Sequence, residues 1–390
     1  MKKAVFKFAG TALAVAALVP FIAQSAATAS PTKFKLNSVG SDVTFCASKK
    51  VDKVYKVAVK PTSANKVYDT PPYLSSNIGC ESTPPTYVVK ADTVHAAITY
   101  SASNLPPNGG TAGITALVND NGAGNIAFAR STSGRSSSNP ANLEFWAYGL
   151  DAVSWDHFTS NTSAPATLSA AQIAGIYNCT YTNWNQVGGG NALITRYYPV
   201  TTSSTASFFA KLFLGGSEPV STGTCPITFV PQNDATQVAS ADQTTSILPY
   251  SYANYFAQTS GLYGSGGNLA LGTVLGEVNG TAPSSTTIVE AAAFANISGD
   301  ACTATPVTGQ FCGSRYIYNV TWQKLPATYY AAVIDLIGVP STGKAGANSY
   351  CSNKYATTLK DYGFVPLTKA TTAQSTSGDP VPGSSYCRQF

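Results

Sequence analysis

The residues with the clearest chemical potential in this sequence are hydroxyl and glycine residues gathered in four short segments. They are residues 40–44 (GSDVT), 108–113 (NGGTAG), 129–135 (ARSTSGR) and 201–205 (TTSST). Hydroxyl groups and free backbone N–H groups at the start of a helix form a binding site for an anion. One such segment alone is typical of an ordinary capped turn. Four of them predict an anion-binding site if the fold brings them together.

Catalytic and metal-binding patterns are not found. A serine-histidine-aspartate triad needs a histidine, and the candidates His95 and His157 lie in no recognised motif. The pair Asp156-His157 is adjacent in sequence, and adjacent side chains point in different directions. The sequence has no C-x-x-C spacing for zinc and no glycine-rich nucleotide loop. We therefore expect a protein that is not an enzyme and that uses no cofactor and no metal.

The charge and the N-terminus indicate the class of protein and its compartment. The chain has 23 Lys+Arg and 18 Asp+Glu among 390 residues. Lys2 and Lys3 precede an apolar run at residues 12–22 and an A-x-A cleavage site at residues 27–29, which predicts a signal peptide over residues 1–29. Without Lys2, Lys3 and Lys7 the balance is 20 − 18 = +2. This near-neutral charge argues against nucleic-acid binding.

We therefore expect an exported protein, periplasmic or at the cell surface or outside the cell. An uncleaved membrane anchor is the alternative to a signal peptide. No cysteine lies near the cleavage site, so a lipid anchor is not indicated.

Eight cysteines lie beyond the predicted signal peptide. An even number in an exported chain indicates disulfide bonds. Pairing in sequential order would close the shortest loops, and we predict that order, although free thiols or another pairing stay open. The cysteines are Cys46, Cys80, Cys179, Cys225, Cys302, Cys312, Cys351 and Cys387.

The elements that must position the four segments alternate between strands and helices. Ser169 and Gln172 form a capping box at the start of a helix, and Pro326 and Gly338 bound another. Further helices are predicted from Phe208 to the Gly215-Gly216 pair and over residues 352–362. Strands are predicted at residues 87–89, 126–129, 143–154 and 316–322. This alternation indicates an α/β fold with mainly parallel strands, and the length suggests two domains of roughly 100–200 residues.

The order of these segments resembles a known family. Residues 126–132 (IAFARST), 149–153 (GLDAV) and 203–205 (SST) fall in the order of its landmarks, and residues 168–177 (LSAAQIAGIY) followed by 182–189 (TNWNQVGG) are the most specific match. Residues 247–252, 316–320 and 362–367 match later landmarks. The chain thus resembles the PstS-like phosphate-binding proteins of ABC importers, in the type II periplasmic-binding-protein superfamily. The resemblance covers nearly all of the chain after residue 29.

The resemblance implies a two-lobe α/β fold with a ligand cleft between lobes joined by two hinge crossings. Residues 30–153 and 312–390 would form the first lobe and residues 154–311 the second. It further implies a monomer that binds inorganic phosphate or a related oxyanion and delivers it to an ABC permease. The alternative is an extracellular or surface interaction protein on the same scaffold with an altered ligand pocket.

The resemblance also implies which residues bind the anion, and two of them depart from the family pattern. Ser204 replaces the glycine of a Ser-Gly-Thr loop, and Thr132 stands where some members place an aspartate that accepts the phosphate proton. Arg130, Arg135 and Arg196 are candidates for a cation at the site. The expected ligand-binding residues are Ser41, Thr44, Thr111, Arg130, Ser131, Thr132, Ser203, Ser204 and Thr205.

Overall fold

The structure is a computed structural model that describes most of the chain beyond the predicted signal peptide. The described residues are 34–58, 66–69, 80, 86–92, 94–200, 203–264, 266–298, 301–303, 305–338, 349–367 and 387–389. The signal peptide and its cleavage site lie outside them. No helix in this part of the chain is both long and apolar enough to cross a bilayer.

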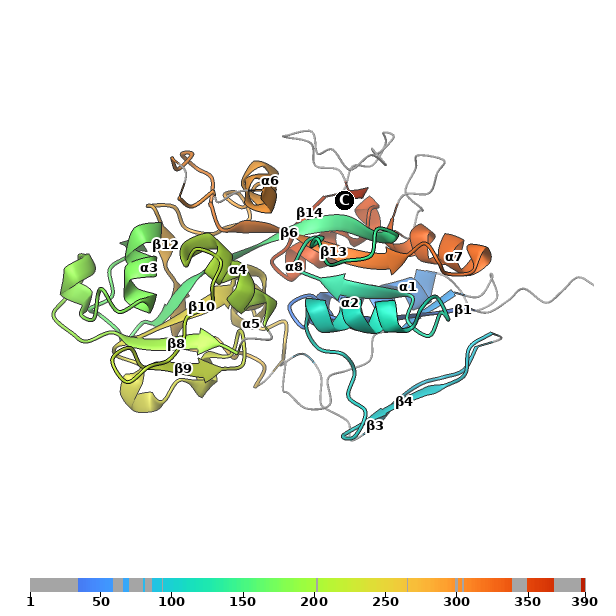
Figure 1. Ribbon diagram of the computed structural model, residues 1–390, viewed down its shortest axis with the longest axis horizontal. Helices are drawn as coiled ribbons and strands as arrows, with labels where there is room; N and C mark the ends of the chain where they lie inside the picture. The colour runs from blue at the N-terminus through green and yellow to red at the C-terminus, as the bar shows by residue number, and fades with distance from the viewer. Residues whose placement is uncertain are drawn as a thin grey trace, which may run out of the picture.

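One long strand runs through two lobes and is shared by both. In Figure 1, β6 (Leu143–Phe158) passes from the lobe on the right to the lobe on the left. Its first part pairs with β13 (Ser314–Trp322), and its last part pairs with β10 (Ser246–Ser251) and β11 (Thr273–Leu275). The main path of the sheet is β2-β1-β5-β13-β6-β10-β8-β9. The predicted two-lobe α/β fold is therefore confirmed. The expectation of mainly parallel strands is wrong, because the central strands β6 and β13 pair antiparallel with each other and with their other neighbours in the main path.

The first lobe contains parallel strands followed by helices. The strand β1 (Phe34–Gly40) pairs in parallel with β2 (Lys66–Asp69) and β5 (Phe128–Ser131). The helix α1 (Phe45–Ala58) follows β1, and α2 (Gly110–Asn119) precedes β5. The remaining elements of this lobe are α7 (Ala327–Ile337), α8 (Ala356–Asp361), β14 (Val365–Pro366) and β15 (Arg388–Gln389). The hairpin of β3 (Thr86–Val89) and β4 (Ile98–Ser101) extends away from this lobe (Figure 1).

The second lobe repeats this arrangement. Its strand β8 (Thr195–Pro199) pairs in parallel with β9 (Ile227–Val230) and with β10. The helix α4 (Ser204–Phe213) follows β8, and α5 (Tyr252–Thr259) follows β10. The other elements are α3 (Ala170–Tyr177), α6 (Glu290–Ser298), β7 (Thr167–Leu168) and β12 (Glu277–Val278).

Local sequence signals explain the segment of residues 182–189. Asn183 caps a short 3-10 helix (Trp184–Val187), and Gln186 completes a capping box with it. Trp184 is buried in the core, and Gly188 ends the helix with a φ of 95°. A side chain at Gly189 would place its Cβ 2.1 Å from the carbonyl oxygen of Ser163. The segment is therefore a tight structural turn rather than part of a binding loop.

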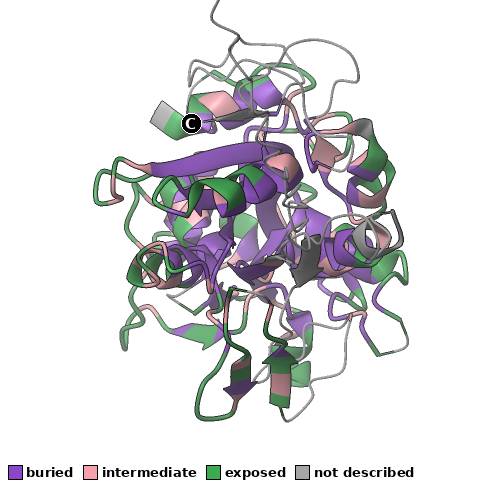
Figure 2. Cartoon of the chain, turned by 90° about the vertical axis from the view of Figure 1, so that its right-hand side faces the viewer, coloured by how far each residue is buried: buried purple, intermediate pink, exposed green. Residues whose placement is uncertain are grey.

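The core follows the strands that both lobes share. Figure 2 shows the buried strands enclosed by helices whose outer faces are exposed. All residues of β13 are buried, and so are all residues of β6 except His157. A strand buried on both faces is expected where helices cover both sides of a sheet.

The cysteines pair in sequential order, as predicted. The bonds are Cys46–Cys80, Cys179–Cys225, Cys302–Cys312 and Cys351–Cys387. The bonds close segments of 10 to 46 residues. Cys46–Cys80 and Cys351–Cys387 lie within the first lobe and Cys179–Cys225 within the second, whereas Cys302–Cys312 spans the expected boundary at residue 312, where the chain returns to the first lobe.

The carboxyl group of Asp156 on β6 should make stability depend on pH. It is 1% exposed, and burial raises the pKa of Asp156 well above its usual value of 3.8. The folded state then binds the proton more tightly than the unfolded state, so stability falls as pH rises from about 4 through the raised pKa. We expect Asp156→Asn to be progressively more stable than wild type as pH rises from about 4 to about 8, measured as the midpoint of thermal unfolding.

The exposed carboxyl group of Asp361 provides the matched control for this measurement. The midpoint of thermal unfolding of Asp361→Asn should follow the same pH dependence as that of wild type. A difference between Asp156→Asn and wild type that stays constant across this pH range would contradict the assignment.

Candidate ligand-binding site

The candidate site lies where parallel strands from both lobes end. The strands β1 and β5 of the first lobe and β8, β9 and β10 of the second run in parallel sets. In open α/β sheets, ligands bind beyond the carboxyl ends of such strands. The loops that follow these five ends contain residues 41–44, 132–135, 203–205, 232–233 and 251–254. Three of these loops belong to the predicted segments.

Two helices begin at this site, and polar side chains bond backbone N–H groups at or just before their first turns. The hydroxyl oxygen of Ser203 accepts hydrogen bonds from the backbone N–H groups of Thr205 and Ala206, each 3.1 Å long. The carboxylate of Asp42 accepts a 2.8 Å bond from the N–H of Val43, just before α1. These N–H groups are therefore satisfied within the protein, and the dipoles of α1 and α4 still favour negative charge near their N-terminal ends.

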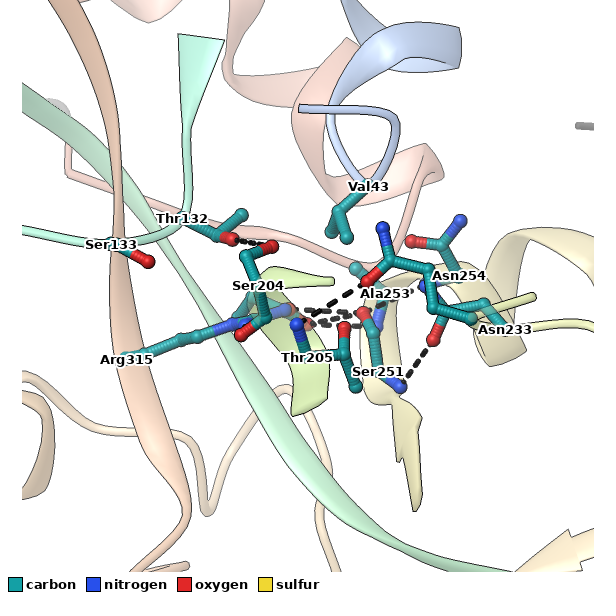
Figure 3. Close-up of polar contacts among 12 residues, drawn as sticks. Val43, Thr132, Ser133, Ser204, Thr205, Asn233, Ser251, Ala253, Asn254 and Arg315 are labelled. Atoms are coloured by element: carbon teal, nitrogen blue, oxygen red, sulfur yellow. Dashed lines mark hydrogen bonds and ion pairs between the residues drawn. The ribbon is translucent and has the colours of Figure 1, made fainter. Parts of the chain in front are cut away.

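Direct hydrogen bonds join the two lobes across the cleft. The Thr132 hydroxyl donates to the hydroxyl oxygen of Ser204 at 2.6 Å, as Figure 3 shows. The side-chain amide of Gln232 donates to the Asp42 carboxylate, and its oxygen accepts from the Ser203 hydroxyl. The same oxygen lies 3.3 Å from the backbone nitrogen of Thr205. These hydrogen bonds between polar side chains of the two lobes hold the cleft closed. The residues that make them, together with their neighbours Ser41 and Thr205, are called the cluster below.

Two hydroxyl groups in this cluster are buried without a hydrogen-bond partner among the described residues. They belong to Ser41, which precedes α1, and to Thr205, in the first turn of α4, and both residues are 0% exposed. The side-chain oxygen of Asn254, at the start of α5, is also buried without a hydrogen-bond partner among the described residues. A buried polar group left unsatisfied costs about 1–3 kcal/mol. A ligand that accepts hydrogen bonds from Ser41 and Thr205 would remove this cost.

A buried ion pair holds the site loops together where the strands cross between the lobes. Arg315 on β13 lies opposite Asp151 on β6, and its guanidinium approaches the carboxylate at 2.7 and 3.0 Å. The same carboxylate accepts from the Ser251 hydroxyl and from the backbone N–H of Ala253. Arg315 also donates to the carbonyl oxygen of Ser204 at 3.2 Å. This pair therefore fixes the starts of α4 and α5 relative to both crossing strands.

Two of the arginines named from the sequence as candidate cations, Arg130 and Arg196, donate to backbone carbonyl groups. The guanidinium of Arg130 donates to the hydroxyl of Ser38 at 2.7 Å and to carbonyl oxygens of Ser38, Gly40 and Ser41. Arg196 donates to the carbonyl oxygens of residues 176, 181 and 194. Arg130 therefore shapes the loop that presents Ser41, and Arg196 lies within the second lobe.

The other predicted residues differ in how close they come to the cluster. The Ser131 hydroxyl donates to the carbonyl oxygen of Ser133 at 2.7 Å, and that of Thr44 lies 3.4 Å from the carbonyl oxygen of Ser41. Both are buried next to the cluster and stabilise its loops. Thr111 is exposed in the first turn of α2, so its hydroxyl is not part of this buried group.

Several residues of the site were not identified from the sequence. Arg315 is the one charged residue of β13, and Asp151 lies in the middle of β6 between mostly apolar residues; charges in such positions are the signal that could have indicated a buried pair. Gln232 and Asn233 lie in a short loop with no motif. The Asn233 side chain accepts from the backbone N–H of Ser251 at 2.8 Å and so holds the loop before α5.

The carboxyl group of Asp42 is held in an unusual environment. Burial raises the pKa of Asp42, although the Gln232 amide and the Val43 N–H, which donate to it, oppose the shift. When ionised, the carboxylate accepts hydrogen bonds only. It is an acidic group beside the two unpartnered hydroxyls.

Comparisons with known proteins establish the fold. No protein-family model and no curated protein sequence match this chain. The ABC-type phosphate transport receptor from Vibrio cholerae is similar in structure, with a TM-score of 0.52 and 16% identity over 85% of this chain and 99% of that one. A high-affinity periplasmic phosphate-binding protein, PfluDING, solved with phosphate bound, has a TM-score of 0.51 and 13% identity over 86% of this chain and 91% of that one. The predicted resemblance is therefore confirmed as a likeness of fold.

The bonds across the cleft should hold the protein closed before any ligand binds. Thr132→Val combined with Gln232→Leu removes both contacts, each worth about 0.5–1.5 kcal/mol, and leaves Asp42 without its amide partner. We expect the ligand-free variant to have a larger radius of gyration than wild type in small-angle X-ray scattering. Thr228→Val, on the exposed edge strand β9, is the control. Equal radii for wild type and the double variant would contradict this role.

Proposed function

We propose that this chain is an exported, non-enzymatic solute-binding protein that captures inorganic phosphate or a related oxyanion between its lobes. An ABC permease would receive the ligand. The observation that carries this proposal is the pair of buried, unpartnered hydroxyls, Ser41 from one lobe and Thr205 from the other. Ser41 precedes α1 and Thr205 lies in the first turn of α4, so both hydroxyls lie near the positive end of a helix dipole.

Uncharged hydrogen-bond donors at the site are consistent with the small net charge of the chain. Without the predicted signal peptide the balance is 20 − 18 = +2, so bulk charge gives little attraction for an anion. Hydroxyls and helix N-termini can hold a tetrahedral oxyanion, because its negative oxygens strengthen each hydrogen bond. Arg130 and Arg315 would contribute indirectly, because they fix the loops that present these donors.

The Asp42 carboxylate would favour a protonated oxyanion. Thr132 supplies no carboxylate on its loop, but Asp42 provides one next to Ser41. A carboxylate accepts a hydrogen bond from the O–H of monohydrogen phosphate and repels a fully ionised oxyanion such as sulfate. The expected order of affinity is therefore phosphate over sulfate.

The boundaries of the lobes belong to the same proposal. Residues 30–153 and 312–390 would form one lobe, and residues 154–311 the other. In support of this division, β6 leaves its partner β13 at Ala152 and joins β10 at Val153. Closure around the ligand would then be a hinge motion at this exchange of partners.

The first test is calorimetric titration of the oxidised protein lacking residues 1–29, with phosphate and then with sulfate. We expect saturable binding of phosphate and weaker binding of sulfate. A folded protein that gives no heat with phosphate at millimolar concentration would contradict the proposal. That result would favour an extracellular interaction protein on the same scaffold.

The hydroxyl variants test the site itself. Ser41→Ala and Thr205→Val each remove one donor to a charged ligand, worth about 1.5–3 kcal/mol. Phosphate affinity should fall by about 10-fold to 100-fold in each variant. Thr111→Val, which removes an exposed hydroxyl, should change the affinity by less than about twofold. Equal losses in all three variants would show that the cluster of Ser41 and Thr205 is not the binding site.

A further inference from the structure

A separate cavity lies between the lobes beside the proposed oxyanion site. Its volume is about 480 Å³, and it is lined from the first lobe by Thr132, Arg135 and Tyr318 and from the second by Phe208, Lys211 and Asn296. Pockets of roughly 300–1,000 Å³ hold small organic ligands. This cavity is therefore far larger than an inorganic oxyanion needs.

One face of α4 connects the oxyanion site to the cavity. Ser204, Ser207, Phe208 and Lys211 are spaced by three or four residues and so lie along one side of the helix. Ser204 contacts Thr132 at the start of this side, and the other three line the cavity. In Figure 3, Ser133 lies on one side of the Thr132–Ser204 contact, and Thr205, Ser251 and Asn254 lie on the other. A ligand whose head is held at the start of α4 would extend along this face.

The cavity walls combine aromatic rings with cationic groups. Phe208 contributes a ring from α4, with the Arg315 guanidinium 5.4 Å from its centre, and Tyr316 and Tyr318 contribute rings from β13. The Lys211 ammonium donates to the carbonyl oxygens of Asn296 and Ile297 at the end of α6, so its position at the wall is fixed. Rings and cations together favour a flat, electron-rich group over a chain of hydroxyls.

We propose that the cavity binds the organic group of a phosphate monoester, preferably one that carries an aromatic ring. This inference rests on the proposed function, because the phosphate would occupy the cluster of Ser41 and Thr205. The ester linkage would lie at the Thr132–Ser204 contact. There the Thr132 hydroxyl, which now donates to Ser204, can donate to the bridging oxygen of the ester. Inorganic phosphate would occupy only the cluster of Ser41 and Thr205 and would make no contact within the cavity.

The test compares phenyl phosphate with inorganic phosphate by calorimetric titration of the oxidised protein lacking residues 1–29. We expect phenyl phosphate to bind at least about tenfold more tightly, because the ring gains aromatic contacts. Phosphate binding without any gain for phenyl phosphate would overturn this inference and leave the proposed function intact. No binding of either compound would overturn both.

Two variants show whether the gain comes from the cavity. Phe208→Ala removes the ring on α4, and Ser207→Leu fills the cavity from an exposed position that should tolerate the change. Each should abolish the advantage of phenyl phosphate while the affinity for inorganic phosphate stays within about twofold. Phe229→Ala, a partly exposed ring on β9, should leave both affinities unchanged. An advantage that survives both cavity variants would overturn the assignment.

Discussion

The buried ion pair of Asp151 and Arg315 is the interaction on which the rest of the structure depends. It joins the two crossing strands at the boundary between the lobes, and both partners are nearly inaccessible to solvent. Ser251, Ala253 and Ser204 are bonded to the same pair, so the starts of α4 and α5 take their positions from it. Breaking a buried pair by removing one partner typically costs about 3–5 kcal/mol. Here the same change would also release the loops that form the floor of the site.

Local features of the fold could be predicted from the sequence, and long-range partners could not. The capping box of Ser169 and Gln172 involves neighbouring residues, and the disulfides follow from the shortest loops, so both predictions are confirmed. The contact of Gln232 with Asp42 spans 190 residues, and no local pattern specifies it. Ser203 and Thr205 were expected from their place before a helix. Their cross-lobe neighbours became visible only in three dimensions.

The arginines show why the type of a residue is a weak guide to its role. A guanidinium next to an anion-binding loop suggests a direct contact with the anion. Arg130 instead donates to carbonyl oxygens and a hydroxyl at the end of β1 and in the loop that follows it, and so holds the backbone that presents Ser41. Its charge still lies close to the cluster, where it lowers the pKa of Asp42 in opposition to burial. The anion binding proposed for this cleft thus rests on the placement of hydroxyl groups more than on a cation in direct contact.

The long strand β6 also has a consequence for the order in which the chain folds. The strands β8, β9 and β10 lie between β6 and β13 in the sequence, so their lobe can pair its own strands before β13 is available. The first lobe must wait for β13, whose Arg315 is 164 residues beyond Asp151. Contacts this distant in sequence form slowly. During folding, the inserted lobe should therefore form first, and the cleft between the lobes should be the last feature of the molecule to form.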